Sequence, residues 1–269
     1  MLLLVGLLAL WMVGYVLFFS GLQESRSQQQ LYAQLREEFH TGAAALNQPI
    51  QPGAPVALIK GAGLDSLVVV EGTSSKELQA GPGHSRNTPL PGQPGTSLIV
   101  GRATSFGGPF AHISSMRQGQ KLTVVTDQGT FSYSVLEVRH GGQLAPPIMK
   151  SGEGRMILAS AEGSGWQTGW APNRAVYVYT QLGGTPQVDP GGRVSAVPSN
   201  EKLLHGQADT ITLLELVLWL QLLIIAAVGF VWLNGKWFRG SAWLVSMPVF
   251  FVALWGASSA IVLLLPNVM

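Results

Sequence analysis

Residues 122–135 have the sequence LTVVTDQGTFSYSV, in which two short runs of apolar, β-branched and aromatic residues flank Asp127, Gln128 and Gly129. Such runs favour strands, and Asp and Gly between them are typical of a tight turn, so this stretch predicts a β-hairpin. Five similar runs, bounded by Gly, Pro, Asn or Asp, lie at residues 56–59, 67–70, 97–100, 156–158 and 175–179. Repeated short strands separated by turns predict a small all-β barrel or sandwich.

This β pattern occupies residues 52–182, and the segments on either side differ from it. Residues 21–51 mix Gln, Leu, Glu and Arg, which predicts a helical stalk. Residues 183–210 begin with a stretch rich in Gly, Pro and Ser, which predicts a flexible linker. Inside the β region, residues 89–95 read PLPGQPG and predict a fixed loop, because Pro and Gly favour turns over strands.

The composition points to a membrane protein, since 47% of the residues are hydrophobic and only 11% are charged. A soluble domain has roughly 25% charged residues. Three apolar runs, Leu2 to Phe19, residues 211–233 and residues 242–265, are each close to the roughly 20 residues that cross a bilayer. The first could be a cleaved signal peptide, but no Lys or Arg precedes it and no clear small-residue cleavage site follows it. We therefore expect a retained anchor at residues 1–20.

The short turn between the last two runs, residues 234–241, fixes the expected orientation. Its charged residues are Lys236 and Arg239. Positively charged turns stay in the cytoplasm, so the N-terminus is expected inside and the long segment between the first two spans outside. The prediction is a multi-pass protein of the cell membrane whose β domain lies outside the cytoplasm.

The absence of cysteine excludes disulfides, thiolate metal sites and a cysteine nucleophile. The five histidines show no ligand spacing, so we expect no metal site and no cofactor. The net charge of +2 suggests neither nucleic-acid binding nor a polybasic lipid-binding patch.

Several motifs follow one another across the β region: Gly72-Thr73, Gly81 to His84, residues 91–95 (PGQPG), residues 101–110, and Gly119 ahead of residues 122–126. In this order, over about residues 54–182, the chain resembles the sortases. These are membrane-anchored cysteine transpeptidases of Gram-positive bacteria that join cell-wall sorting signals to amine acceptors. The resemblance implies an eight-stranded sortase-like β-barrel. Together with the apolar runs and the charged turn, the expected fold is mainly β: an extracytoplasmic barrel with one N-terminal and two C-terminal transmembrane helices.

The resemblance also implies the chemistry that sortases use, in which a Cys thiolate attacks, a His handles protons and an Arg holds the substrate or the oxyanion. The family's His falls on Arg102, and its Cys falls on Ala161. Only Arg174 stands where the family's Arg would. The resemblance therefore implies no catalytic residue set and a pseudoenzyme of the sortase family.

Residues near the lost nucleophile suggest other roles. Ser160 is a candidate nucleophile, but its hydroxyl needs an activating base, which Arg102 cannot supply because it stays protonated. Glu162 could pair with Arg102 or Arg174 across the old active site, or could be solvated. Arg102, Glu162 and Arg174 are thus the candidate binding residues of the barrel groove. His84, His112 and His140 are expected in loops or on the barrel surface.

The C-terminal spans carry candidate contacts for a membrane partner. Glu215 and Gln221 are polar groups in an apolar run, and Gly256 and Ser259 belong to a small-residue run that allows close helix approach. Glu215 could instead be hydrated near the outer interface.

These features lead to a first hypothesis: a catalytically inactive, sortase-like binding or scaffolding subunit of a cell-envelope membrane complex. Its partners would be integral membrane proteins at the C-terminal helices and an extracytoplasmic protein or peptide at the groove. One alternative is an acyl transferase or hydrolase that uses Ser160. Another is a receptor that binds Leu-Pro-x-Thr-Gly-like peptides without cutting them.

Overall fold

The predicted hairpin forms in the computed structural model: β5 (Lys121–Thr126) pairs antiparallel with β6 (Gly129–His140), and Thr126 opposite Gly129 closes the turn. The structure describes residues 8, 10–41, 49–141, 143, 149–162, 174–189, 191, 193–194, 196–201, 210–236, 239–264 and 268. The remaining strands among these residues are β1 (Pro55–Gly61), β2 (Leu64–Glu71), β3 (Gly83–His84), β4 (Gly95–Val100), β7 (Gly154–Glu162) and β8 (Arg174–Gly183).

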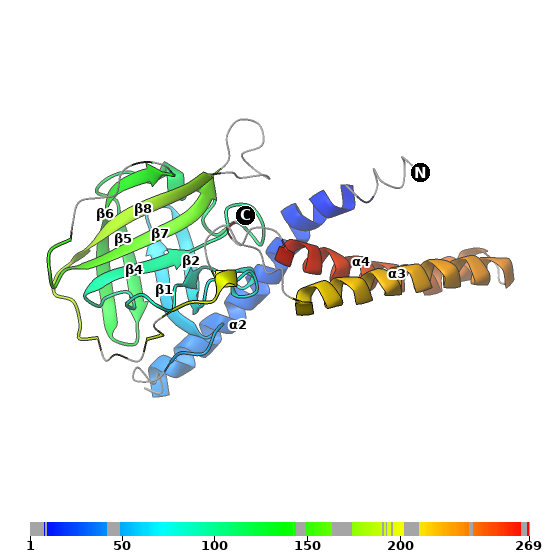
Figure 1. Cartoon of the computed structure of the whole chain (residues 1–269), viewed down its shortest axis with the longest axis horizontal. Helices are drawn as coiled ribbons and strands as arrows, with labels where there is room; N and C mark the ends of the chain where they lie inside the picture. Colours follow the sequence, from blue (N-terminus) through cyan, green and yellow to red (C-terminus); the bar gives the residue numbers. More distant parts are fainter. Residues whose placement is uncertain are drawn as a thin grey trace.

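The eight strands of the described chain close into a barrel in the order β1-β2-β3-β4-β7-β8-β6-β5 (Figure 1). Neighbouring strands run antiparallel except in the pairs β2/β3 and β4/β7, which are parallel. The barrel confirms the predicted fold class, and every run that the sequence marks as β lies inside a strand. Only the two-residue β3 comes from a segment without such a run.

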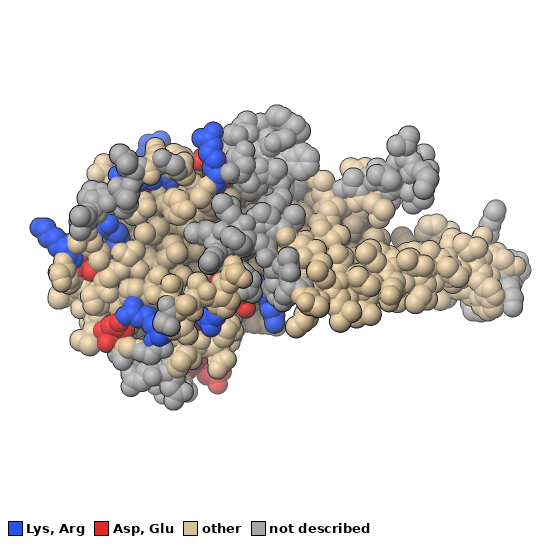
Figure 2. Space-filling model, in the orientation of Figure 1, with Lys and Arg blue, Asp and Glu red and all other residues tan. Residues whose placement is uncertain are grey.

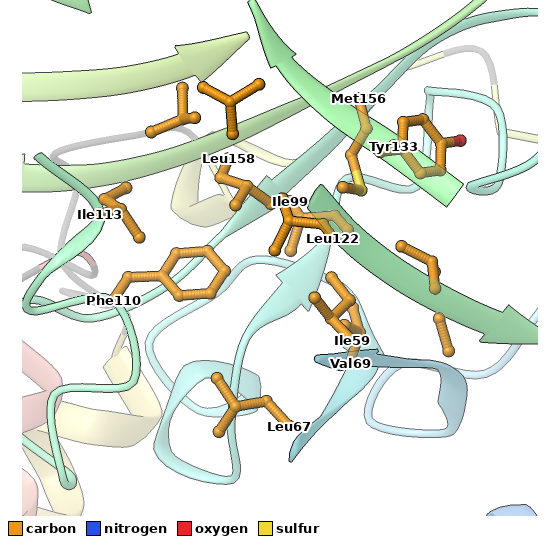
Figure 3. Packing of buried hydrophobic residues seen from close by; sticks show 14 of the residues in the cluster. Ile59, Leu67, Val69, Ile99, Phe110, Ile113, Leu122, Tyr133, Met156 and Leu158 are labelled. Atoms are coloured by element: carbon orange, nitrogen blue, oxygen red, sulfur yellow. The ribbon is translucent and has the colours of Figure 1, made fainter. Parts of the chain in front are cut away.

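The barrel interior is filled by side chains that alternate along each strand, as a period of two requires. Leu122 and Val124 of β5 and Phe131, Tyr133 and Val135 of β6 are all buried. Figure 3 shows buried side chains of β5 and β6 packed with residues of the other strands, such as Ile59, Ile99 and Leu158. Burial of each large side chain contributes about 1.5–3 kcal/mol, so the interior is the main source of the barrel's stability.

The loop at residues 89–95 is fixed, as predicted. The Gly92 N–H donates to the buried Tyr133 hydroxyl at 2.7 Å. Gly92 has a φ of +99°, and a Cβ there would lie 2.3 Å from the Phe131 ring, so only glycine fits. The loop is therefore packed directly on the core.

The predicted stalk is a helix, and it lies against the barrel. Residues 10–41 are helical without a break: residues 10–14 are α-helical, the π-helical turn η1 (Tyr15–Phe19) follows, and α2 (Ser20–Thr41) continues from it. Leu31 and Leu35 of α2 pack on Val68 and Val70 of β2. The Gln28 amide bonds the backbone N–H and C=O of Val68, at 2.7 and 3.0 Å. These contacts hold α2 along one side of the barrel (Figure 1).

Two long helices, α3 (Thr210–Lys236) and α4 (Arg239–Leu264), pack as a hairpin that projects from the barrel (Figure 1). By length and composition each could cross a membrane, and they are the two described helices of which this is true. The start of the first apolar run lies outside the described residues, so the N-terminal span stays a prediction. The start of α3 and the end of α4 both lie at the barrel end of the hairpin.

The described part of the predicted linker follows the barrel closely. The Gln187 N–H donates to the fixed loop at 2.8 Å. Farther along, Arg86 donates twice to the Glu201 carboxylate, at 2.5 and 3.1 Å, and the Thr73 hydroxyl donates to the Glu201 carbonyl at 2.6 Å. Glu201 is buried in this contact. Composition predicts a flexible segment here, but hydrogen bonds hold Gln187 and Glu201 against the barrel.

Candidate functional site

The candidate site lies where β4 and β7 end. These strands pair in parallel with Val100 opposite Ala159. Residues two positions farther along each chain, Arg102 and Ala161, are therefore carried to the same end of the barrel. The positions that the sortase resemblance assigns to the His and the Cys are thus neighbours in the fold.

Arg102 has a fully buried side chain whose donors are used inside the protein. Nε donates to the Leu78 carbonyl at 3.2 Å, Nη2 to the Ser75 carbonyl at 3.0 Å and Nη1 to the Ser105 hydroxyl at 3.0 Å. The guanidinium carbon lies 5.1 Å from the centre of the Phe106 ring. Burial lowers the pKa of Arg102 to about 9. The guanidinium therefore joins two loops and is not offered to a ligand, contrary to its expected role in the groove.

Ser160 and Ala161 of β7 are both buried, and neither is placed for nucleophilic attack. The Ser160 hydroxyl donates to the Gly101 carbonyl at 2.8 Å. A carbonyl oxygen accepts a hydrogen bond but is not a base that takes the proton. The Ala161 methyl packs in a small apolar cluster with Leu78 and Val100.

Glu162 has a different partner from the ones expected. Its Oε2 lies 2.5 Å from Nδ1 of His140, at the end of β6. In the described chain the partner of Glu162 is thus His140 rather than Arg102, whose guanidinium is enclosed elsewhere. Arg174, at the exposed start of β8, is the residue directly opposite Glu162 in the strand register. Glu162, Arg174 and His140 form the polar rim of this end of the barrel.

The other histidines divide between interior and surface. His112 is exposed in a loop, as expected. His84 is buried, contrary to the expectation of a surface residue: Nδ1 lies 2.8 Å from Glu71 Oε2, and Nε2 lies 3.0 Å from the Pro89 carbonyl. Both ring nitrogens are therefore engaged, as a structural role requires. The described residues hold no group of three His, Cys, Asp or Glu side chains that could bind a metal ion.

A residue that sequence reasoning missed completes the site. Val268, which follows α4, is fully buried in the same cluster as Ala161. Its carbonyl accepts the Ala103 N–H at 3.1 Å. Nothing in the periodicity marks this residue as a contact of the barrel, because the contact depends on where α4 ends.

The loop after β4 also docks the barrel on the helices. Phe106 packs with Tyr15 of the first helix and Val262 of α4, and its N–H donates to the Ser20 hydroxyl at 2.9 Å. Glu24 lies nearby and is buried, and desolvation raises the pKa of its carboxyl to about 7. The loop after β4 thus connects the candidate site, the first helix and α4.

Of the four candidate membrane contacts, Glu215 and Gln221 are exposed, whereas Gly256 and Ser259 are buried or half-buried. Glu215 and Gln221 are exposed on α3, and Trp219 Nε1 lies 3.5 Å from Glu215 Oε1. Gly256 of α4 faces Trp219, because a Cβ there would lie 2.2 Å from the indole ring. Ser259 is half-buried on α4. Gly256 is therefore used inside the hairpin, whereas Glu215 and Gln221 face outward.

The first helix uses the same small-residue run of α4. Trp11 Nε1 donates to the Ser258 hydroxyl at 3.0 Å, and Tyr15 stacks edge-on against Trp255 with ring centres 5.3 Å apart.

Figure 2 shows that charged side chains of both signs are scattered over the visible face of the barrel, while the visible face of the hairpin is uncharged.

Comparison with known proteins shows what the barrel is similar to. Residues 59–158 match the family model of the sortase domain. Solved structures similar to the chain include a sortase D5 transpeptidase of Clostridium perfringens, with 20% identity, a TM-score of 0.46 and coverage of 60% of this chain and 98% of that one. They also include sortase E of Streptomyces avermitilis (20% identity, TM-score 0.41, coverage 56% and 99%). A third is the SrtA sortase of Actinomyces oris, with 20% identity, a TM-score of 0.44 and coverage of 55% of this chain and 93% of that one. No curated protein matches the chain.

Proposed function

We propose that this chain, whose barrel is a sortase-like domain, is a non-catalytic binding or scaffolding subunit of a membrane complex in the cell envelope. The observation that carries the proposal is the absence of cysteine from the whole sequence. Without a thiol the chain cannot form the thioester on which sortase transpeptidation depends. Ala161, at the aligned position, offers only a methyl group.

The state of the other aligned positions supports this proposal. Arg102 is enclosed by Leu78, Ser75 and Ser105 and cannot exchange protons with a substrate. Arg174 is exposed, and an Arg alone stabilises negative charge without supplying a nucleophile. The sortase-like barrel thus keeps an exposed Arg able to hold a negatively charged group, and the chain has no thiol with which to cut.

The outward face of α3 supports a partner within the bilayer. A polar side chain in hydrocarbon is costly, so such residues usually face another protein or water. Glu215 and Gln221 lie exposed on α3, among apolar neighbours such as Leu214, Leu218 and Leu220. Their exposure leaves them available to a helix of an integral membrane protein. We place the barrel outside the cytoplasm, because Lys236 and Arg239 mark the turn of the hairpin as cytoplasmic.

The second candidate function is acyl transfer or hydrolysis by Ser160. The position of Ser160 beside Ala161 is what favours it, and its enclosed hydroxyl, donated to Gly101, argues against it. If Ser160 acted as a nucleophile, the full chain would acquire an acyl adduct from an activated peptide ester, detectable by intact mass, and Ser160→Ala would abolish it. We expect no adduct with either protein. A third candidate, a receptor for sorting-signal-like peptides, would use Glu162 and Arg174 on the rim.

The proposal is tested by capturing partners of the full chain from its native membrane in mild detergent. The variant carries Glu215→Leu and Gln221→Leu together. Its matched control carries Leu214→Ile and Leu220→Ile, which are exposed on the same helix with the same spacing. We expect an integral membrane protein to be captured with the native chain and the control and to be lost with the variant. Equal capture with all three would contradict a contact through these polar residues.

A further inference from the structure

The loop between β2 and β3, residues 72–82, encloses Arg102 from one side. Its Ser75 and Leu78 carbonyls accept hydrogen bonds from the guanidinium, at 3.0 and 3.2 Å. Ser75 is fully buried, and its hydroxyl has no hydrogen-bond partner among the described residues. A ligand could replace the two carbonyls on Arg102 only after this part of the loop had moved.

The two ends of the loop are fixed by bonds to the barrel and to α2. The Gly72 N–H donates to the His84 carbonyl of β3 at 2.8 Å, and the Gln28 amide of α2 donates to the Ala80 carbonyl at 2.8 Å. Residues 73–79 lie between these fixed ends. They are the part of the loop that can move without disturbing the strands on either side.

The moving part is bonded to a residue from a distant segment of the chain. The buried Thr73 hydroxyl donates to the Glu201 carbonyl at 2.6 Å, across 128 positions of sequence. Glu201 ends the short helix η5 (Ser199–Glu201) and is the last described residue before α3 begins at Thr210. The segment that leads from the barrel to the bilayer hairpin is therefore bonded to the loop that encloses Arg102.

Glu201 is itself fastened to the barrel by Arg86. The Arg86 guanidinium donates through Nε and Nη2 to the two carboxylate oxygens, at 3.1 and 2.5 Å. The Glu201 side chain is 6% exposed, so this two-point ion pair is shielded from water and is stronger than a surface pair. Arg86 follows Ser85, whose N–H donates to the Leu98 carbonyl of β4 at 2.9 Å. The anchor of Glu201 thus belongs to the barrel wall.

We infer that Glu201 is a clasp, which holds residues 73–79 closed over Arg102 as long as its carboxylate stays on Arg86. When Glu201 leaves, Thr73 loses its bond and the loop can open. The group that could then bind to Arg102 is an anion such as a carboxylate, because a freed guanidinium offers charge and paired donors. The inference goes beyond the proposed function, since it concerns how the barrel opens and needs no membrane partner.

The lack of cysteine allows a direct test on the full chain in detergent or nanodiscs. Ser75→Cys places a single thiol under the closed loop, and its reaction with N-ethylmaleimide is followed by intact mass. We expect Glu201→Gln to raise the rate at least about 10-fold, because an enclosed thiol reacts only when its cover opens. Thr73→Val, which removes the hydroxyl that donates to Glu201, should raise it as well. An unchanged rate in Glu201→Gln would overturn the inference.

Two controls separate opening of the loop from other effects. Asp189→Asn removes a carboxylate from the same segment, where it pairs with Arg193, and should leave the rate of Ser75→Cys unchanged. Val124→Cys reports on the barrel interior and should stay unreactive with and without Glu201→Gln. If Asp189→Asn acted like Glu201→Gln, or if Val124→Cys became reactive as well, Glu201 would not be a clasp of this loop.

A double change tests whether Arg86 and Glu201 act as one unit. Arg86→Gln alone should raise the rate of Ser75→Cys about as much as Glu201→Gln does. Both changes together should raise it no further, because residues that share one interaction are not additive. Effects of the two changes that multiply would contradict the clasp.

Discussion

Arg102, at the position that the resemblance assigns to the sortase His, has a structural role. Its three hydrogen bonds run to two loops, through Leu78, Ser75 and Ser105, and it lies over Phe106. The resemblance predicts Arg102 and Ala161 at one site, and the parallel register of β4 and β7 carries both residues to the same end of the barrel. The resemblance cannot supply the bonds to Leu78 and Ser75, since these come from a loop more than twenty residues earlier in the chain.

Replacing Arg102 by Ala is expected to destabilise the barrel by about 3 kcal/mol. The change leaves the carbonyls of Leu78 and Ser75 without their donors and opens a cavity. Chemical unfolding of the full chain in detergent, followed by near-UV circular dichroism, measures it. Arg174→Ala serves as the control, because Arg174 is exposed and its loss should cost less than about 0.5 kcal/mol. Equal effects of the two changes would show that Arg102 is not a structural residue.

Glu24 gives the protein a pH dependence. Burial raises the pKa of this carboxyl from 4.5 to about 7 in the folded chain, so the folded state binds more protons between these values. Stability is therefore greatest below pH 4.5 on this account, and decreases as the pH rises through 7. The difference is about 2 kcal/mol after allowance for partial solvent access.

Glu24→Gln should remove most of this dependence, as measured by unfolding at pH 5 and pH 8. Glu37→Gln, on the exposed side of the same helix, is the control, and its stability should depend on pH as that of the native chain does. If Glu24→Gln lost as much stability between pH 5 and pH 8 as the native chain does, the pH dependence would come from another group.

The strands and the hairpin could be predicted because alternation in the sequence matches burial along a strand. β3 could not, since its two residues, Gly83 and His84, form a strand only by pairing with β2 and β4. A Cβ at Gly83 would lie 2.1 Å from the Gly72 carbonyl, so tertiary approach sets that position. The docking of α2 was missed for a similar reason: its apolar face is narrow, and the amide of Gln28 supplies much of the specific contact.

The packing of α3 on α4 is tested with a pair of glycines. Gly256→Leu is expected to destabilise the hairpin by about 2 kcal/mol or more, because its side chain must displace the Trp219 ring. Gly229→Leu is the matched control on α3, where an added Cβ meets no atom within 4 Å. Tryptophan fluorescence during thermal unfolding in nanodiscs reports both. If both variants melted together with the native chain, the contact between Gly256 and Trp219 would not hold the helices.

The loop after β4 connects the sortase-like barrel to the α3–α4 hairpin. Phe106 contacts Tyr15 and Val262, while Ala103 in the same loop contacts Val268. The first helix, α4 and the end of the barrel that holds Arg102 and Ala161 are therefore mechanically connected. Composition predicts the apolar spans, but only the three-dimensional arrangement shows that the small residues of α4 are used within the chain and that Glu215 and Gln221 remain on the outside.

The central claim, that the chain acts by binding a membrane partner, is tested most directly by site-specific photo-crosslinking in the native membrane. A photoreactive residue is placed at Gln221 of the full chain, and in a second protein at Trp219, which faces Gly256 and should give an internal crosslink to α4. The account predicts one discrete adduct between position 221 and an integral membrane protein. An internal crosslink from position 219, with no protein adduct from position 221, would contradict it.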